Sequence, residues 1–172
     1  QGDRLSYPLA IRSGKERTVL GADLNASFTL PGITVTTSQV NTQQDAKMGA
    51  WTGPATLEAR GARAMALPPA AARDGALRFD TIVHKAPAGK VTLAMGATAL
   101  DASALFKRLA GTGKHTVSVP LACFEARGLD LATVDTPFSV TSNADFVAAF
   151  ANIEIAGGAA KDADAVRCDE LK

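Results

Sequence analysis

Hydrophobic and polar residues alternate through residues 76–95, ALRFDTIVHKAPAGKVTLAM. The positions on one side of this alternation are apolar or β-branched: Leu77, Phe79, Thr81 and Val83. A period of two places them on one face of a pleated strand, against a core. Pro87 and Gly89 suit the turn that follows, because proline fixes φ and glycine frees it, and the alternation resumes at Val91. The pattern predicts a half-buried antiparallel hairpin.

Turn residues divide much of the remaining chain into short strands. Pro31-Gly32 is a turn dipeptide between two apolar and β-branched runs, 26–30 and 33–39, and it predicts a second hairpin. Alternation predicts further strands in four segments: 55–60, 115–120, 137–142 and 145–155. The last two segments are predicted to form a hairpin that turns at Ser142-Asn143.

One stretch has the spacing of a helix. In residues 100–110, LDASALFKRLA, apolar side chains recur three and four positions apart, and Asp101 or Ser103 is a candidate cap. Gly111 is expected to end this helix. Residues 121–127 predict one further helical turn, ended by Gly128.

These elements together predict an all-β fold. About eight or nine short strands at regular spacing, with one or two short helices, are typical of an antiparallel β-sandwich of the jelly-roll type. Strands and helices do not alternate as βαβ units, so a parallel sheet is excluded. We expect residues 21–156 to form the sandwich, residues 1–20 a linker and residues 157–172 a C-terminal tail.

Composition narrows the classes of partner. The 18 lysines and arginines nearly balance the 17 aspartates and glutamates, so the chain lacks the charge that binding to nucleic acid or to an anionic membrane needs. No apolar run approaches the roughly 20 residues that cross a bilayer. The first residues, QGDRLSYPL, lack the features of a signal peptide, which favours a removed targeting segment or a piece of a longer protein.

The two cysteines, Cys123 and Cys168, fit no zinc-binding spacing. Two alternatives stay open: a disulfide that pins the C-terminal tail, or two free thiols. A disulfide would indicate an oxidising compartment.

The residues predict no catalytic or metal site. The only two histidines, His84 and His115, have no carboxylate at ligand spacing, and the acidic residues of the tail suit a solvated surface. The serines lack a Gly-x-Ser-x-Gly elbow, and no glycine-rich loop precedes a helix. We therefore expect no cofactor, except that structural calcium stays open.

One group of residues suits a sugar. Planar amides and carboxylates bind sugar hydroxyls, and aromatic rings stack on the apolar faces of sugars. The segment 39–51 offers both kinds of group: Gln39, Gln43, Gln44, Asp45 and Trp51. The alternative is that Trp51 packs in the core, since it continues an apolar strand, and that the amides are only solvated. Aromatic residues make up only 5% of the chain, which argues against an extended stacking platform.

Several motifs in combination resemble a known family. They are Asp45-Ala46-Lys47-x3-Trp51-x-Gly53, LRFDTIVHKAPAGKVTLAMG, KHTVSVPLACF and VDTPFSVTSNADFVAAFANIEI. From about residue 19 to about residue 155, the chain is similar to the C-terminal domain of bacterial family 3 glycoside hydrolases of the exo-β-glucanase or β-glucosidase type. Leu5-Ser6-Tyr7 also resembles the end of the catalytic modules that precede this domain.

The resemblance implies a galactose-binding-like sandwich attached to an enzyme that removes glucose from the ends of β-glucans, in the periplasm or outside the cell. In this family the nucleophile is an aspartate, typically followed by an aromatic residue, in a separate domain. This chain has no Asp-Trp or Asp-Tyr pair, so we expect it to be inert on its own. The sequence departs from many relatives at Ala97-Thr98-Ala99, where they carry a cysteine- and glycine-rich stretch.

Two hypotheses about function follow. In the first, the chain is an accessory domain that packs on the catalytic domains of the same polypeptide, and residues 39–45 reach the rim of their sugar site. In the second, it is an independent carbohydrate-binding module for β-glucan or gluco-oligosaccharide. Its site would then be either Trp51 with its polar neighbours or the strand face of Arg78, Asp80 and His84. The low aromatic content favours the first. Both place the protein in the bacterial periplasm or outside the cell.

Overall fold

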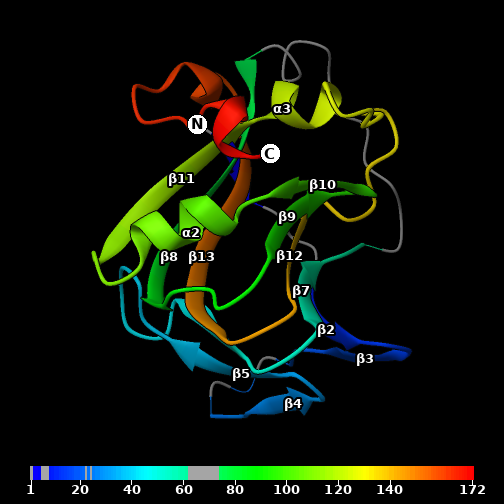
Figure 1. Cartoon of the computed structure of the whole chain (residues 1–172), viewed down its shortest axis with the longest axis vertical. Helices are drawn as coiled ribbons and strands as arrows, with labels where there is room; N and C mark the ends of the chain where they lie inside the picture. The colour runs from blue at the N-terminus through cyan, green and yellow to red at the C-terminus, as the bar shows by residue number, and fades with distance from the viewer. Residues whose placement is uncertain (1, 5–7, 22, 24, 62–73) are drawn as a thin grey trace.

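The computed structural model describes residues 2–4, 8–21, 23, 25–61 and 74–172, and it consists of two antiparallel sheets packed face to face (Figure 1). The first sheet has the strand order β11-β8-β13-β6-β5-β4, and β1 pairs with the end of β13. The second sheet has the order β10-β9-β12-β7-β2-β3. The prediction of an all-β antiparallel sandwich with one or two short helices is confirmed.

The strands of the first sheet are β1 (Gly2–Arg4), β4 (Phe28–Leu30), β5 (Ile33–Ser38), β6 (Ala46–Trp51), β8 (Ala76–Lys85), β11 (Lys114–Pro120) and β13 (Phe146–Ala156). The strands of the second are β2 (Leu9–Ser13), β3 (Glu16–Val19), β7 (Ala55–Ala59), β9 (Val91–Met95), β10 (Thr98–Asp101) and β12 (Phe138–Ser142). Two α-helices are described, α2 (Ser103–Leu109) and α3 (Leu121–Glu125).

The core between the sheets is built around a cluster of aromatic rings. Phe79 of β8 packs edge-on against Phe138 and Phe150, with ring centroids 5.4 and 5.8 Å apart. Phe106 of α2 contacts Phe146 and Phe150, so the helix closes one side of the same cluster. These rings are almost fully buried. Edge-on pairs of this kind add to the stability that burial itself supplies.

The predicted alternation in residues 76–95 is correct, but the predicted hairpin is wrong. Thr81 and Val83 are buried as expected, yet β8 pairs with β11 and β13, whereas β9 pairs with β10 and β12. The connection crosses from one sheet to the other. The same is true of β12 and β13, and the two crossings lie side by side, since the amide of Ala88 donates to the carbonyl of Asp145 (2.8 Å). Turn residues cannot distinguish a hairpin from such a crossing.

The hairpin at Pro31-Gly32 is confirmed, with Leu30 opposite Ile33. Gly32 has φ +91°, and a Cβ there would lie 2.9 Å from the carbonyl oxygen of Pro54. The turn therefore requires glycine, because of both its backbone angle and the close approach of a neighbouring turn.

The helix is shorter than predicted. The structure assigns Leu100 to β10, and α2 begins only at Ser103. The residue that precedes the helix is Ala102, and it makes no capping bond with its side chain. The two candidate caps bond elsewhere: Asp101 accepts from the amide of Ser103 (2.9 Å), and Ser103 accepts from the amide of Val91 (2.8 Å). The predicted turn at 121–127 matches α3, and Gly128 follows with φ +98°.

The N-terminal segment differs from the expected linker at 1–20. Residues 9–19 form β2 and β3 of the second sheet, and Ala10 and Ile11 are completely buried. Arg12 and Arg17 both donate to the buried carboxylate of Glu58 on β7, each at 3.1 Å. These contacts make the segment part of the sandwich. Leu5-Ser6-Tyr7 lies outside the described residues.

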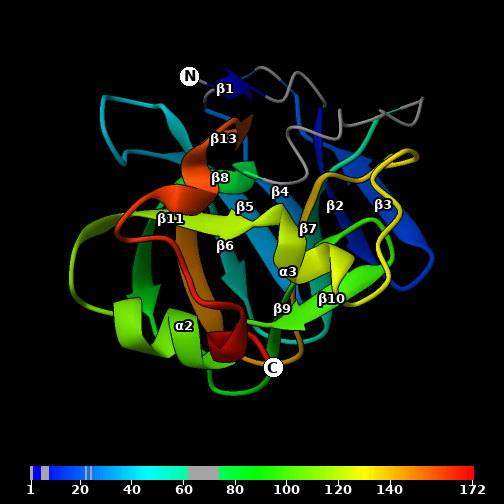
Figure 2. The same ribbon diagram turned by 90° about the horizontal axis from the view of Figure 1, so that it is seen from above.

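The C-terminal tail at 157–172 packs against the sandwich (Figure 2). It contains two short 3-10 helices, η1 (Ala159–Lys161) and η2 (Cys168–Glu170). Val166 and Leu171 are buried, and Cys168 forms a disulfide with Cys123 of α3. None of the described helices is long and apolar enough to span a membrane.

Candidate functional site

The loop at 39–45, between β5 and β6, is shaped by one carboxylate. Asp45 accepts hydrogen bonds from the backbone amides of Val40 (2.8 Å), Asn41 (2.9 Å) and Thr42 (3.2 Å). Burial would raise the pKa of Asp45, but these donors hold the pKa below the ordinary value of 3.8. The predicted sugar ligand Asp45 therefore bonds the backbone of its own loop. Its role in the structure is to fix the loop's conformation.

The three glutamines of the predicted site are exposed. Gln39 begins the loop, and Gln43 and Gln44 lie near its end. In the described part of the chain, no residue hydrogen-bonds to their side-chain amides. Gln44 has φ +61°, a left-handed backbone conformation that is uncommon for residues other than glycine. These amides are free to bond an external hydroxyl.

Trp51 lies away from the other members of the predicted site. Its side chain is 1% exposed, its Nε1 donates to the carbonyl oxygen of Ala55 (2.9 Å), and its ring packs on Phe146. It occupies an inward position of β6, opposite Ile33 and Phe146. Of the two interpretations of Trp51, the structure favours the core residue, because a buried ring cannot stack on a sugar.

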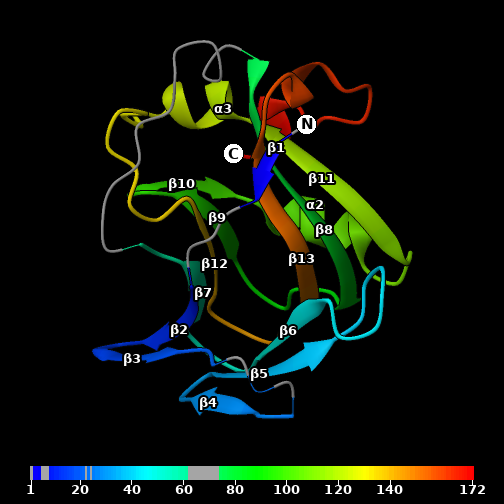
Figure 3. The same cartoon turned by 180° about the vertical axis from the view of Figure 1, so that it is seen from behind.

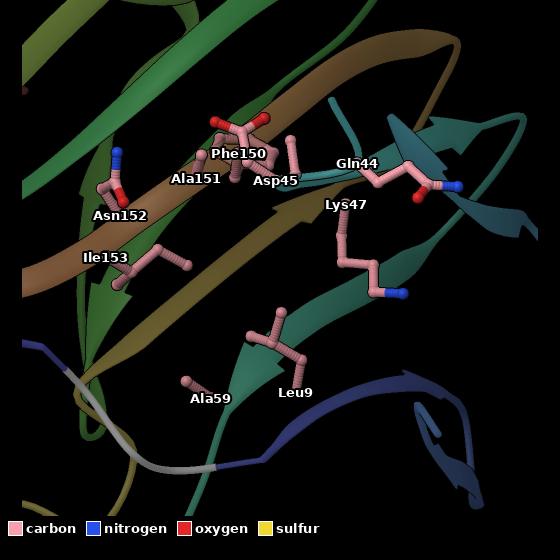
Figure 4. Close-up of a pocket in the computed structure, with 10 residues that line it drawn as sticks. Leu9, Gln44, Asp45, Lys47, Ala59, Phe150, Ala151, Asn152 and Ile153 are labelled. Atoms are coloured by element: carbon pink, nitrogen blue, oxygen red, sulfur yellow. The ribbon is translucent and has the colours of Figure 1, made fainter. Parts of the chain in front are cut away.

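A pocket of about 300 Å³ lies beside the loop (Figure 4). Gln44 and Lys47 line one side, and Asn152 and Ile153 of β13 line the other. Leu9, from the second sheet, contributes apolar surface. The volume is at the lower end of the range for small-molecule sites, and polar groups beside apolar side chains are typical of such sites.

The wall formed by β13 is irregular. Ala151 lies opposite Asp80 and Glu154 opposite Arg78, so the pairing of β13 with β8 contains a bulge around Asn152 and Ile153. Asn152 has φ +52°. On the other edge of β13, β6 pairs with residues only as far as Phe150, and β1 pairs with residues from Glu154 onward. Within the described ranges, residues 151–153 therefore have no strand beside them on the edge that borders the pocket.

Gln44 and Asn152 are the only non-glycine residues with positive φ in the described part of the chain, and both line this pocket. Such conformations cost free energy and cluster at functional sites. This coincidence identifies the pocket and the 39–45 loop as the candidate site. The sequence pattern does not single out Asn152, although an asparagine inside an apolar strand is unfavourable for regular pairing and suits a left-handed bulge position.

The other surface that sequence pattern offered to a sugar is the outward face of β8. Its polar groups bond one another: the Nε of Arg78 donates to Glu154 (2.8 Å), and Asp80 accepts from Thr116 (2.6 Å). His84 is exposed at the end of the strand. Among the described residues, no group of three or more histidine, cysteine, aspartate or glutamate side chains is placed to hold a metal ion.

Two antiparallel sheets packed face to face, with short helices beside them, define a β-sandwich. Residues 7–155 match the Exop_C family, described as galactose-binding domain-like, and the chain belongs to this family. The resemblance inferred from the sequence motifs is confirmed by this match. No curated protein is similar enough to the chain to count as a match.

Solved structures share the fold at low sequence identity. The exo-1,3/1,4-β-glucanase ExoP from a Pseudoalteromonas species superposes with a TM-score of 0.76 at 16% identity, over 96% of this chain and 21% of the enzyme. The extra C-terminal domain of the same enzyme gives 0.73 at 17% identity, over 92% of this chain and 89% of that domain. This chain thus spans about a fifth of the whole glucanase.

A carbohydrate-binding module is also similar in fold. The family 30 module of a Clostridium thermocellum cellulosomal cellulase superposes with a TM-score of 0.58 at 16% identity, over 90% of this chain and 95% of the module. The family match and these neighbours fit an accessory or carbohydrate-binding domain.

Proposed function

We propose that this chain is the accessory domain of a family 3 glycoside hydrolase that acts on β-glucans. It packs on the catalytic domains of the same polypeptide, and the 39–45 loop reaches the rim of their sugar site. Gln39, Gln43 and Gln44 supply side-chain amides to sugar hydroxyls there. The observation that carries the proposal is an exposed, amide-rich loop whose backbone is fixed by Asp45, beside a pocket lined by both left-handed residues.

The compartment is part of the proposal. The disulfide between Cys123 and Cys168 suits an oxidising environment, because thiols stay reduced in the cytosol. We therefore propose a periplasmic or secreted protein.

The second candidate function is an independent carbohydrate-binding module. The likeness to the family 30 module and the pocket lined by Gln44, Lys47 and Asn152 support it. Against it, the described residues offer the pocket no exposed aromatic ring: Phe150, the one aromatic residue among those described that line it, is 2% exposed. Without an exposed ring to stack on a sugar, the pocket lacks a contact that would supply much of an independent module's affinity for the sugar.

Calorimetric titration of this chain with laminari- and cello-hexaose separates the two functions. The accessory function predicts weak or no binding by the chain alone. In the longer enzyme, it predicts that Gln43→Ala and Gln44→Ala raise KM for oligosaccharides about 3- to 10-fold, the effect of losing one hydrogen bond. Saturable micromolar binding by the chain alone would favour the independent module. An unchanged KM in both variants would exclude the loop from the sugar site.

A further inference from the structure

Asp80 joins three segments that are far apart in sequence. It faces outward from β8, and its Oδ1 accepts a hydrogen bond from Thr116 of β11 (2.6 Å). Its Oδ2 accepts from the side-chain amides of Asn41 and Asn152, both at 2.8 Å. Asn41 belongs to the 39–45 loop and Asn152 to the bulge of β13. One carboxylate oxygen therefore bonds Asn152, which lines one side of the pocket, and Asn41, which belongs to the loop whose end lines the other side.

The loop between β5 and β6 lies on the outer face of the first sheet (Figure 3). Small side chains on that face allow the close approach. Val40 packs with Met48 on a patch of three buried alanines: Ala46, Ala149 and Ala151. The Nζ of Lys114 donates to the Oδ1 of Asn41, so the side-chain amide of Asn41 is bonded at both its oxygen and its nitrogen. Larger side chains at the alanine positions would lift Asn41 away from Asp80.

We infer that Asp80 is a positioning residue that holds the 39–45 loop and the 151–153 bulge in one fixed relation. Asp80 does not line the pocket, and it acts through Asn41 and Asn152. Fixing both walls before a ligand arrives reduces the entropy lost on binding. The link to sugar binding rests on the proposed function, whereas the effect of Asp80 on the two walls does not.

The test uses backbone hydrogen exchange, because Val40, Asn41 and Thr42 donate their amides within the loop. In Asp80→Ala we expect these three amides to exchange roughly tenfold faster, since a charge-assisted bond that held the loop is lost. Exchange at Val83 and Leu93, in the core strands, should stay as in the wild type. Exchange of the loop amides at the wild-type rate would overturn the inference.

Two variants separate this effect from general destabilisation. Glu154→Gln weakens an ion pair with Arg78 on the same two strands, but it does not touch the loop, and loop exchange should be unchanged. Asp80→Asn keeps an oxygen that can accept from both asparagine amides, and its own amide can donate to Thr116, so it should restore most of the protection. Faster loop exchange in Glu154→Gln, equal to that in Asp80→Ala, would contradict a specific role of Asp80.

Two further measurements keep the outcome clear. If Asp80→Ala fails to fold, Asn41→Ala removes one of the two asparagine hydrogen bonds to Asp80. Because Asn41 is exposed, this variant should accelerate hydrogen exchange in the loop alone. In the longer enzyme, Asp80→Ala should raise KM for laminarihexaose and leave kcat unchanged. Faster loop exchange with an unchanged KM would leave the positioning role intact and count against the proposed function of the loop.

Discussion

The indole nitrogen of Trp51 donates to the carbonyl oxygen of Ala55, 2.9 Å away across the turn that joins β6 to β7. This bond links a strand of the first sheet to a strand of the second. The single tryptophan of the chain is therefore a structural connection between the two sheets, and its exposed fraction of 1% agrees with this role.

Replacement of Trp51 should lower stability and leave sugar contacts intact. For Trp51→Ala we expect the free energy of unfolding to fall by about 3–5 kcal/mol, the usual cost of deleting a large buried ring. Trp51→Phe keeps a ring but leaves the Ala55 carbonyl without its donor, and should cost about 1–3 kcal/mol. Urea unfolding followed by circular dichroism measures both. A raised KM for oligosaccharides in the longer enzyme carrying Trp51→Phe, at wild-type stability, would contradict the assignment.

Gln44→Gly should separate stability from function. A left-handed backbone costs a non-glycine residue about 1–2 kcal/mol, while the greater freedom of glycine in the unfolded chain offsets part of the gain. We expect the free energy of unfolding to stay constant or rise by up to about 1 kcal/mol. The same variant loses its amide and should raise KM in the longer enzyme. Gln43→Ala is the matched control, because only the amide changes there.

Loss of the Cys123–Cys168 disulfide should loosen the tail first. The bridge closes a segment with a sequence separation of 45 residues, and its removal typically costs about 2–4 kcal/mol. The backbone amide of Val166 donates to the carbonyl oxygen of Ser118 (2.8 Å). Ser118 lies on β11, which is an edge strand of the first sheet. We expect Cys123→Ser with Cys168→Ser to unfold at lower urea and to expose this edge. Size-exclusion chromatography of the variant should reveal association through strand pairing.

A variant that loses stability but remains monomeric at high concentration would contradict the protective role of the tail. Arg108→Ala is a suitable control. It breaks an exposed ion pair between α2 and Glu170 of the tail while the disulfide remains, and should change stability by less than about 1 kcal/mol.

Acid should weaken the contribution of Asp80 and Asp45. Burial opposes ionisation of Asp80, but hydrogen bonds from Thr116 and the two asparagines, with the charge of Lys114, lower its pKa below 3.8. The pKa of Asp45 is lowered in the same direction. Because the unfolded state then binds more protons, the contribution is complete above the ordinary pKa and disappears as the pH falls through the lowered folded values.

Urea unfolding of the wild type and of the double variant Asp45→Asn with Asp80→Asn, between about pH 7 and about pH 2, measures this dependence. The wild type should lose more stability than the variant below about pH 4, since the other carboxylates titrate alike in both. Parallel curves would show that neither carboxylate is held ionised by the fold.

The sequence pattern predicted helices, strands and turns well where they depend on residues that are neighbours along the chain. The alternation of residues in β8 depends only on which face is buried, and the turn at Pro31-Gly32 depends on two backbone angles. Burial of Trp51 was one of two interpretations, since an apolar strand position and a sugar platform use the same residue type. The prediction of a linker at 1–20 differs from the structure because Ala10 and Ile11 pair with residues of β7, almost 50 positions further along the chain.

The sequence by itself determined the all-β class, most strand positions, the amide-rich loop and, through its motifs, the family. Only the tertiary structure decided which strands pair across the two sheets, that Trp51 lies inside, and that Asn41 and Asn152 meet on Asp80. The physical reason is the range of each interaction. Periodicity and turn geometry act between neighbours along the chain, whereas strand pairing and shared hydrogen bonds depend on residues that only the folded backbone brings together.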